Sequence, residues 1–149
     1  CFFIIALGGN ADQYDPKNVL LFFVLIWTNN SFAYLVGRKV GEKPLFSSIS
    51  PNKTWEGFFG GLLFSLIVTC IFWQFHSEFS IGFYMIVAFF ISVLSTLGDL
   101  IQSRFKRYAK VKDSGSLIPG HGGFFDRMDS AIFVAPWFFL LLNFKEYVS

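Results

Sequence analysis

Charged residues are scarce in this 149-residue sequence, because Asp, Glu, Lys and Arg together make up only 15% of it. A soluble domain usually carries roughly 25% charged residues, so an ordinary soluble globular protein is excluded. Hydrophobic residues supply 54% of the chain, including 22 Phe, and the mean hydropathy is +0.54. Since a membrane helix needs roughly 20 apolar residues, the sequence predicts a membrane protein with room for about four or five spans.

Cysteine is also rare, and a recognisable leader is missing. Cys1 and Cys70 lie in apolar surroundings without a CxxC or Cys/His spacing, so neither a disulfide framework nor a zinc site is expected. The chain opens without Met and without a basic segment before its first apolar residues, which argues against a signal peptide. We interpret residues 1–9 as the end of a span whose beginning is missing, and the chain as a fragment that lacks N-terminal spans.

Long hydrophobic runs dominate what is present, at residues 19–36, 57–75, 81–97 and 131–144. The last run is short, but it becomes long enough to span a membrane if its helix begins near Phe124. The sequence therefore predicts an all-α fold, a polytopic bundle of membrane helices that forms a single catalytic domain over residues 1–149.

Small and polar residues interrupt two of these runs. The group Thr28-Asn29-Asn30-Ser31 predicts that one side of the first helix faces inward, either for hydrogen bonds between helices or for substrate contact. We expect this helix to end at Gly37-Arg38, where glycine permits a turn. In the second run, Gly57 and Gly61 have the spacing that lets two helices approach closely.

A basic loop at residues 38–53 ends in Ser50-Pro51-Asn52-Lys53. The Ser-Pro pair predicts a helix start, since Pro has no N–H to leave unpaired in a first turn. Lys53, beside the free N–H groups of that turn, could hold an anion, or it could be an ordinary membrane anchor.

The distribution of basic residues predicts the orientation. The loops at 38–53 and 99–127 hold four and six Lys or Arg residues, whereas the turns at 10–18 and 76–80 hold one and none. The positive-inside rule places the two basic loops in the cytosol. We therefore expect a polar cavity that faces the cytosol.

The most polar stretch, residues 99–129, contains six of the twelve basic residues, four of the ten acidic residues and one of the two His. Charge this close to a bilayer is costly and usually functional. If the helix of residues 81–97 continues past Asp99, helical spacing puts on one face Asp99, Ser103, Lys106 and Lys110. The same spacing puts on one face of the next helix Asp126, Asp129 and Ser130. A carboxylate from each helix at one level would suit Mg²⁺.

Residues 119–123 are glycine-rich and lead into a helix, so their backbone N–H groups could approach a phosphate. Acidic metal ligands, a glycine-rich turn and many cations together favour phosphoryl or nucleotidyl transfer. No Ser lies beside a His and an acid as in a hydrolase triad. The alternative is that the Lys and Arg residues are ordinary cytosolic anchors with Asp partners.

Three blocks, at residues 30–38, 49–61 and 103–129, resemble the CDP-diacylglycerol synthase (phosphatidate cytidylyltransferase) family in its C-terminal catalytic portion. The third reads Ser103-Arg-Phe-Lys106-Arg107, Lys112-Asp113 and Pro119-Gly-His-Gly-Gly-Phe-Phe-Asp126-Arg127-Met-Asp129. The resemblance covers roughly residues 26–137. It implies a membrane enzyme of phospholipid biosynthesis that transfers CMP from CTP to phosphatidic acid, giving CDP-diacylglycerol and pyrophosphate.

The resemblance also implies roles for individual residues. The catalytic residues would be Asp99, Lys106 and Asp126, with Asp99 and Asp126 as ligands of Mg²⁺ and a monovalent cation such as K⁺ beside it. The residues that hold substrate phosphates would be Lys53, Ser103, Arg107, Lys112, His121, Gly122, Gly123 and Arg127. Supporting residues would be Asn30, Asp113 and Asp129. The implied partners are CTP, phosphatidic acid, membrane lipid and a second copy of the chain, without nucleic acid.

The residues of these three blocks resemble those of bacterial members of the family, which implies a multi-pass protein of the cytoplasmic membrane. Two positions depart from the family: Asn30 stands where Asp is usual, and Asn52 where Lys or Gly is common. Three alternatives are a CTP-dependent polyprenol or lipid-alcohol kinase, an inactive homologue, and a transporter whose polar loops line a pathway.

Overall fold

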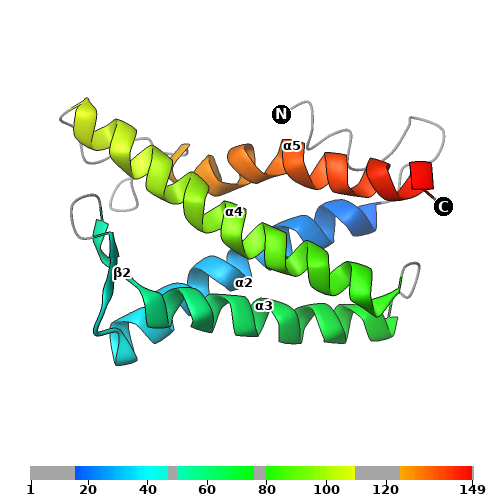
Figure 1. Ribbon diagram of the computed structural model, residues 1–149, viewed down its shortest axis with the longest axis horizontal. Helices are drawn as coiled ribbons and strands as arrows, with labels where there is room; N and C mark the ends of the chain where they lie inside the picture. The colour runs from blue at the N-terminus through cyan, green and yellow to red at the C-terminus, as the bar shows by residue number, and fades with distance from the viewer. Residues whose placement is uncertain (1–15, 47–49, 76–79, 110–124, 149) are drawn as a thin grey trace.

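The computed structural model describes residues 16–46, 50–75, 80–109 and 125–148. In this part of the chain, four helices pack into a bundle (Figure 1): α2 (Pro16–Val40), α3 (Trp55–Phe75), α4 (Ile81–Tyr108) and α5 (Phe125–Val148). A short antiparallel hairpin of β1 (Pro44–Phe46) and β2 (Ser50–Thr54) joins α2 to α3. The helical bundle confirms the predicted fold class, and the hairpin adds to it.

Three of the helices, α2, α3 and α4, are long and apolar enough to cross a membrane. The fourth, α5, contains a shorter apolar segment, Ser130–Asn143, and carries Pro136 within it. The predicted continuation of the third helix past Asp99 is confirmed, as is the early start of the last one. The first helix was predicted to end at Gly37-Arg38, but it continues to Val40.

The predicted helix start at Ser50-Pro51 is wrong. Residues 50–54 form strand β2, in which Ser50 pairs with Phe46 and Thr54 with Pro44. The helix begins at Trp55, and the N–H of Gly57 donates a hydrogen bond to Thr54 Oγ1 at 3.2 Å. Thr54 therefore supplies the capping oxygen that was expected from Ser50, because either hydroxyl can accept from a first-turn N–H.

The apolar core lies among α2, α4 and α5. Its largest fully buried members include Phe22 and Phe138, whose rings stack with centroids 5.4 Å apart. Val87, Ile91 and Val134 belong to the same cluster. Between membrane helices, such packing stabilises the fold through van der Waals contact rather than through removal of water.

Helix α3 packs differently, through a stripe of small residues at every fourth position: Gly57, Gly61, Ser65 and Thr69. A Cβ atom added to Gly57 would lie 2.5 Å from the carbonyl oxygen of Ala33 on α2. The predicted close approach at Gly57 and Gly61 is confirmed, and we call this contact the α2/α3 seam. Large side chains on the opposite side of α3, among them Phe59, Leu63 and Ile67, are exposed, as expected for a surface that faces lipid.

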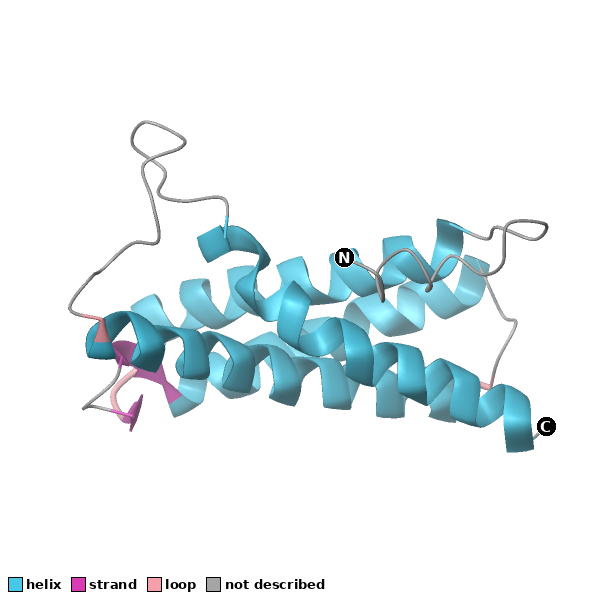
Figure 2. Ribbon diagram, turned by 90° about the horizontal axis from the view of Figure 1, so that it is seen from above, coloured by secondary structure: helices cyan, strands magenta, loops and turns pink. Residues whose placement is uncertain are grey.

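One end of the bundle collects the polar elements. Helices α2 and α4 end there, α3 and α5 begin there, and the hairpin lies at the same end (Figures 1 and 2). The last turns of α2 and α4 carry Arg38, Lys39, Lys106 and Arg107. We call this region the polar end.

Candidate functional site

The hairpin is tied to the first turn of α3. The N–H of Trp55 donates to the carbonyl oxygen of Lys43 at 3.0 Å. The carboxylate oxygen Oε2 of Glu56 accepts from the backbone N–H groups of Glu42, at 3.3 Å, and Lys43, at 3.4 Å. These bonds fix the position of β2, and therefore of Lys53 within it.

The hydrogen bonds at the start of α3 also bear on the anion site that the sequence predicts for this helix N-terminus. The N–H groups of Trp55 and Gly57 already have partners within the protein. They are therefore not free to bind an anion, and Lys53 remains the cationic group at this position.

Lys53 forms an ion pair with Asp99, 46 residues away in sequence, on α4. The two side chains are 27% and 31% exposed, so both are partly shielded from solvent. The structure thus brings together two of the predicted site residues, one assigned to substrate phosphate and one to metal. In this ion pair, the two opposite charges hold each other's side chain in position before a ligand binds.

From Asp99 onward, the side chains that helical spacing predicts on one face of α4 are half-buried. Asp99, Ser103 and Lys106 are all partly covered, whereas Arg104 and Arg107 are exposed. This burial confirms the shared face of the first three. Arg107 belongs to the more open side of the same helical turn.

Asn30 links three helices at the base of this site. Ser95 Oγ on α4 donates to Asn30 Oδ1 at 3.0 Å, and Asn30 Nδ2 donates to Ser130 Oγ on α5 at 3.4 Å. Both serines are buried. An amide can accept and donate at once, whereas an ionised carboxylate could only accept. Hydrogen bonding between helices is thus confirmed for Asn30.

These hydrogen bonds also bear on how deep in the bundle the two predicted metal ligands lie relative to each other. Asp99 lies one helical turn after Ser95 on α4, and Asp126 lies one turn before Ser130 on α5. Because α4 and α5 run in opposite directions, both steps lead toward the polar end (Figure 1). This register favours similar depths for the backbone at Asp99 and at Asp126.

Several predicted site residues lie beyond what the structure describes. Lys112, Asp113, His121, Gly122 and Gly123 lie outside the described residues. Asp126, Arg127 and Asp129 belong to α5, but their side chains lie outside the description. Within the described ranges, no group of three or more His, Cys, Asp or Glu gathers as a metal site. The magnesium site therefore stays a prediction.

Sequence reasoning missed two residues that shape this region. Ser95 is buried and bonds to Asn30, and its signal was a hydroxyl one turn before Asp99 in an apolar run. Glu56 holds the hairpin, and its signal was an acid in the first turn of a helix. Neither sequence feature identifies the hydrogen-bond partner of the residue, because the partners of Ser95 and Glu56 come from other segments of the chain.

Comparison with known proteins places the chain among relatives of similar sequence. The model of the Cytidylyltransferase family matches residues 1–145. A protein of Bacillus subtilis (strain 168) named phosphatidate cytidylyltransferase is 42% identical over 144 residues, which cover 95% of this chain and 53% of that relative. Proteins of the same name from Staphylococcus epidermidis and Staphylococcus aureus are each 44% identical, over 127 and 126 residues. These matches cover 85% and 83% of this chain, and 49% and 48% of those relatives. The chain thus spans about half the length of the curated relatives it matches.

Proposed function

The chain belongs to the cytidylyltransferase family, and from this membership we propose that the protein transfers the CMP group of CTP to phosphatidic acid. The products are CDP-diacylglycerol and pyrophosphate. The observation that carries the proposal is the ion pair between Lys53 and Asp99, which joins a cation and a carboxylate from two sequence blocks at the polar end. Nucleotidyl transfer needs both kinds of group at the phosphates.

The protein is proposed to lie in the bacterial cytoplasmic membrane as a multi-pass protein, with the polar end facing the cytosol. The clustering of Arg38, Lys39, Lys106 and Arg107 at that end supports this orientation. The orientation gives cytosolic CTP access to the site while the lipid stays in the bilayer. A homodimer remains part of the proposal.

The cations at the polar end serve the substrate phosphates. The pair with Asp99 holds the Lys53 ammonium at the site, where it can move to a phosphate oxygen when substrate binds. Ser103 and Lys106 follow on the same face of α4. With Arg107 and the predicted groups at Lys112, His121, Gly122, Gly123 and Arg127, these residues orient the phosphates and neutralise their charge.

The proposed cofactor is Mg²⁺, with a monovalent cation such as K⁺ beside it. The described donors fit magnesium in kind, because the Asp99 carboxylate and the Ser103 hydroxyl are hard oxygen ligands one turn apart on α4. Asp126 would complete the set from α5, at the level that the bonds of Asn30 favour. When bound, the ion offsets negative charge on the phosphates.

The transfer itself is a substitution at phosphorus. An oxygen of the phosphatidate phosphate forms a bond to the α-phosphorus of CTP. The bond between that phosphorus and the oxygen bridging to the β-phosphate breaks, and pyrophosphate leaves with the electron pair. The chain contributes positioning and charge, which supply most of the rate in phosphoryl transfer.

The test measures labelled CDP-lipid and pyrophosphate from radiolabelled CTP, with and without phosphatidic acid and Mg²⁺. We expect both products only when lipid and metal are present together. Asp99→Asn should lower kcat by about 10²- to 10³-fold, because a charge-stabilising group is lost. Glu42→Gln, which changes an exposed acid between α2 and β1, is the matched control and should retain activity.

Other products would identify the alternatives. CDP with a phosphorylated lipid alcohol would indicate the lipid kinase, and solute flux without turnover would indicate the transporter. A folded protein that gives no product, with or without metal, would indicate the inactive homologue. Full activity in Asp99→Asn would contradict the role assigned to Asp99.

A further inference from the structure

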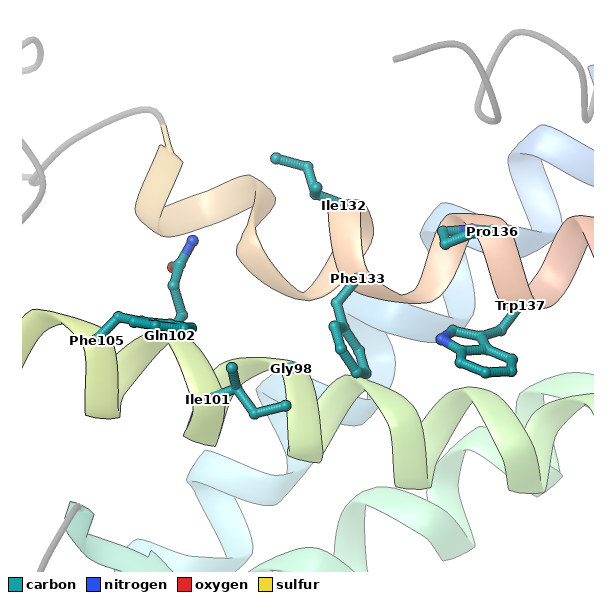
Figure 3. Close-up of a pocket in the computed structure, with 8 residues that line it drawn as sticks. All are labelled: Gly98, Ile101, Gln102, Phe105, Ile132, Phe133, Pro136 and Trp137. Carbon is teal, nitrogen blue, oxygen red and sulfur yellow. The ribbon is translucent and has the colours of Figure 1, made fainter.

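An apolar groove of about 400 Å³ lies between α4 and α5 (Figure 3). Its lining includes Gly98, Ile101, Gln102, Phe105, Phe133 and Trp137. The groove forms because the two helices touch closely at Gly98, where an added Cβ would lie 2.8 Å from Phe133 Cβ, and separate beside this contact. We call this contact the α4/α5 seam.

The groove is open to the outside of the bundle. Phe105 is 68% exposed and Trp137 is 50% exposed, and Ile101 and Ile132 are also among the exposed large apolar residues. On a soluble protein such a surface would be unusual. Here it lies between α4, which is long and apolar enough to cross a membrane, and the apolar segment Ser130–Asn143 of α5, where lipid chains would be the surrounding medium.

The groove adjoins the candidate site along α4. Gly98 and Gln102 line it, and the residues that directly follow them, Asp99 and Ser103, belong to the polar face of α4. The last turns of α4 add Lys106 and Arg107 at the same end. A matching ligand therefore combines an anionic group with a long apolar chain.

Gln102 adds one polar feature within the groove. Its Oε1 atom is buried and has no hydrogen-bond partner among the described residues. Leaving such a buried atom unpaired is unfavourable. The oxygen and nitrogen of an amide are assigned by their bonding partners, so this side chain can turn its N–H toward an acceptor. An ester carbonyl of a glycerolipid provides one.

We propose that this groove holds an acyl chain of the phospholipid substrate, with the lipid phosphate beside Ser103 and Lys106 and an ester carbonyl at Gln102. The identity of the headgroup rests on the proposed function. The groove itself specifies the apolar part of the ligand, which neither the family match nor the sequence motifs locate.

Photolabelling tests occupancy without turnover. The probe is phosphatidic acid with a diazirine in one acyl chain, added to the protein in its native membranes. We expect label at Ile101, Phe105, Ile132 or Trp137 at a yield about tenfold above that at Ile86, which faces outward on the same helix with 52% exposure. Excess unlabelled phosphatidic acid should suppress this label, whereas diacylglycerol without the phosphate should not.

A groove-filling variant tests the same site kinetically. Ile132→Trp should raise KM for long-chain phosphatidic acid about tenfold, and short-chain phosphatidic acid should be affected less. KM for CTP should stay unchanged. Ile86→Trp adds the same bulk outside the groove and should alter none of these constants.

A second variant tests the ester contact. Gln102→Leu should raise KM severalfold for ester-linked phosphatidic acid and leave KM for the ether-linked analogue unchanged, since the ether lacks a carbonyl oxygen. Equal effects on the two lipids would contradict the contact at Gln102.

The outcomes separate this inference from the proposed function. Specific groove labelling in a protein that makes no CDP-lipid would overturn the proposed function and leave the groove as an anionic-lipid site. An active enzyme whose groove takes no more label than Ile86 would overturn the groove assignment. That result is also expected if another protein segment covers the groove.

Discussion

Two helix contacts of the bundle, the α2/α3 seam and the α4/α5 seam, are built in opposite ways. At the α2/α3 seam, glycines place backbone against backbone, and a Cβ on Gly57 or Gly61 would meet a carbonyl oxygen within 2.7 Å. At the α4/α5 seam, Gly98 meets the side chain of Phe133 and a groove opens beside the contact. The first arrangement leaves no room for a ligand, and the second does.

The difference in packing between the two seams matches the residues that each seam holds in position. The α2/α3 seam ends at the hairpin, where Thr54 also lies against Gly37, and so fixes the strand that carries Lys53. The α4/α5 seam lies beside the groove, and Asp99 directly follows the Gly98 that makes this contact. The tightly packed α2/α3 seam therefore holds the strand that carries Lys53, whereas the more open α4/α5 seam borders the face that we assign to the lipid.

Gly57→Leu should cause the largest effect, because it forces the α2/α3 seam apart. Its Cβ would lie 2.5 Å from the Ala33 carbonyl oxygen, which cannot move without its helix. We expect a loss of about 3 kcal/mol or more in the free energy of unfolding. The measurement is thermal unfolding in detergent. Gly82→Leu is the control, since an added Cβ there meets nothing within 4 Å; equal destabilisation by the two would contradict the tight seam.

The same small substitution at both seams compares them directly. Gly61→Ala places a methyl 2.7 Å from the backbone oxygen of Asn29, and we expect a cost of about 2–3 kcal/mol. Gly98→Ala meets Phe133 beside the groove, where α5 has room to shift, and should cost about 1 kcal/mol. Chemical denaturation of both variants gives the two values. If Gly98→Ala proves the more costly, the α4/α5 seam is not the looser one.

Asn30→Ala should have an intermediate effect, because it leaves the buried hydroxyls of Ser95 and Ser130 without their amide partner. We expect a loss of about 1 kcal/mol. A double-mutant cycle with Ser130→Ala isolates the bond that crosses to α5, and its coupling energy should be about 0.6 kcal/mol. A coupling energy of zero would show that Asn30 does not hold α5 to α2.

Glu56→Ala should have the smallest effect on global stability, because its two hydrogen bonds are exposed to solvent. The local effect should be clearer. Hydrogen exchange at the amides of Glu42 and Lys43 should accelerate, while exchange in the middle of α3 stays unchanged. Unaltered exchange at the hairpin would mean that Glu56 does not anchor it.

Much of the helical framework could be predicted from the sequence. Apolar runs located α3, α4 and α5 because a membrane-spanning helix requires a long apolar segment. The spacing of Gly57 and Gly61 predicted a close contact because small side chains permit it. The hairpin escaped prediction because the pairing of Ser50 with Phe46 depends on a second strand. Ser50-Pro51 is a helix-start pattern only in the absence of that strand.

The candidate site was predictable in its parts but not in its connections. Helical periodicity grouped Asp99, Ser103 and Lys106, but no periodicity relates Lys53 to Asp99 across 46 residues. That contact depends on how α3 and α4 pack. In the same way, the sequence marked Asn30 as an inward-facing polar residue, whereas its bonds to Ser95 and Ser130 follow from three helices meeting.

The pairing of Lys53 with Asp99 has a thermodynamic consequence. Each charge is the counter-charge of the other, so an anion that engages Lys53 leaves Asp99 uncompensated and more attractive to a cation. Linkage makes this coupling reciprocal: bound anion should tighten cation binding by the same factor by which bound cation tightens anion binding. Calorimetric titration of each ligand in the presence of the other would measure the two factors. Lys53→Met should bring both toward one, so that the two ligands no longer influence each other's affinity.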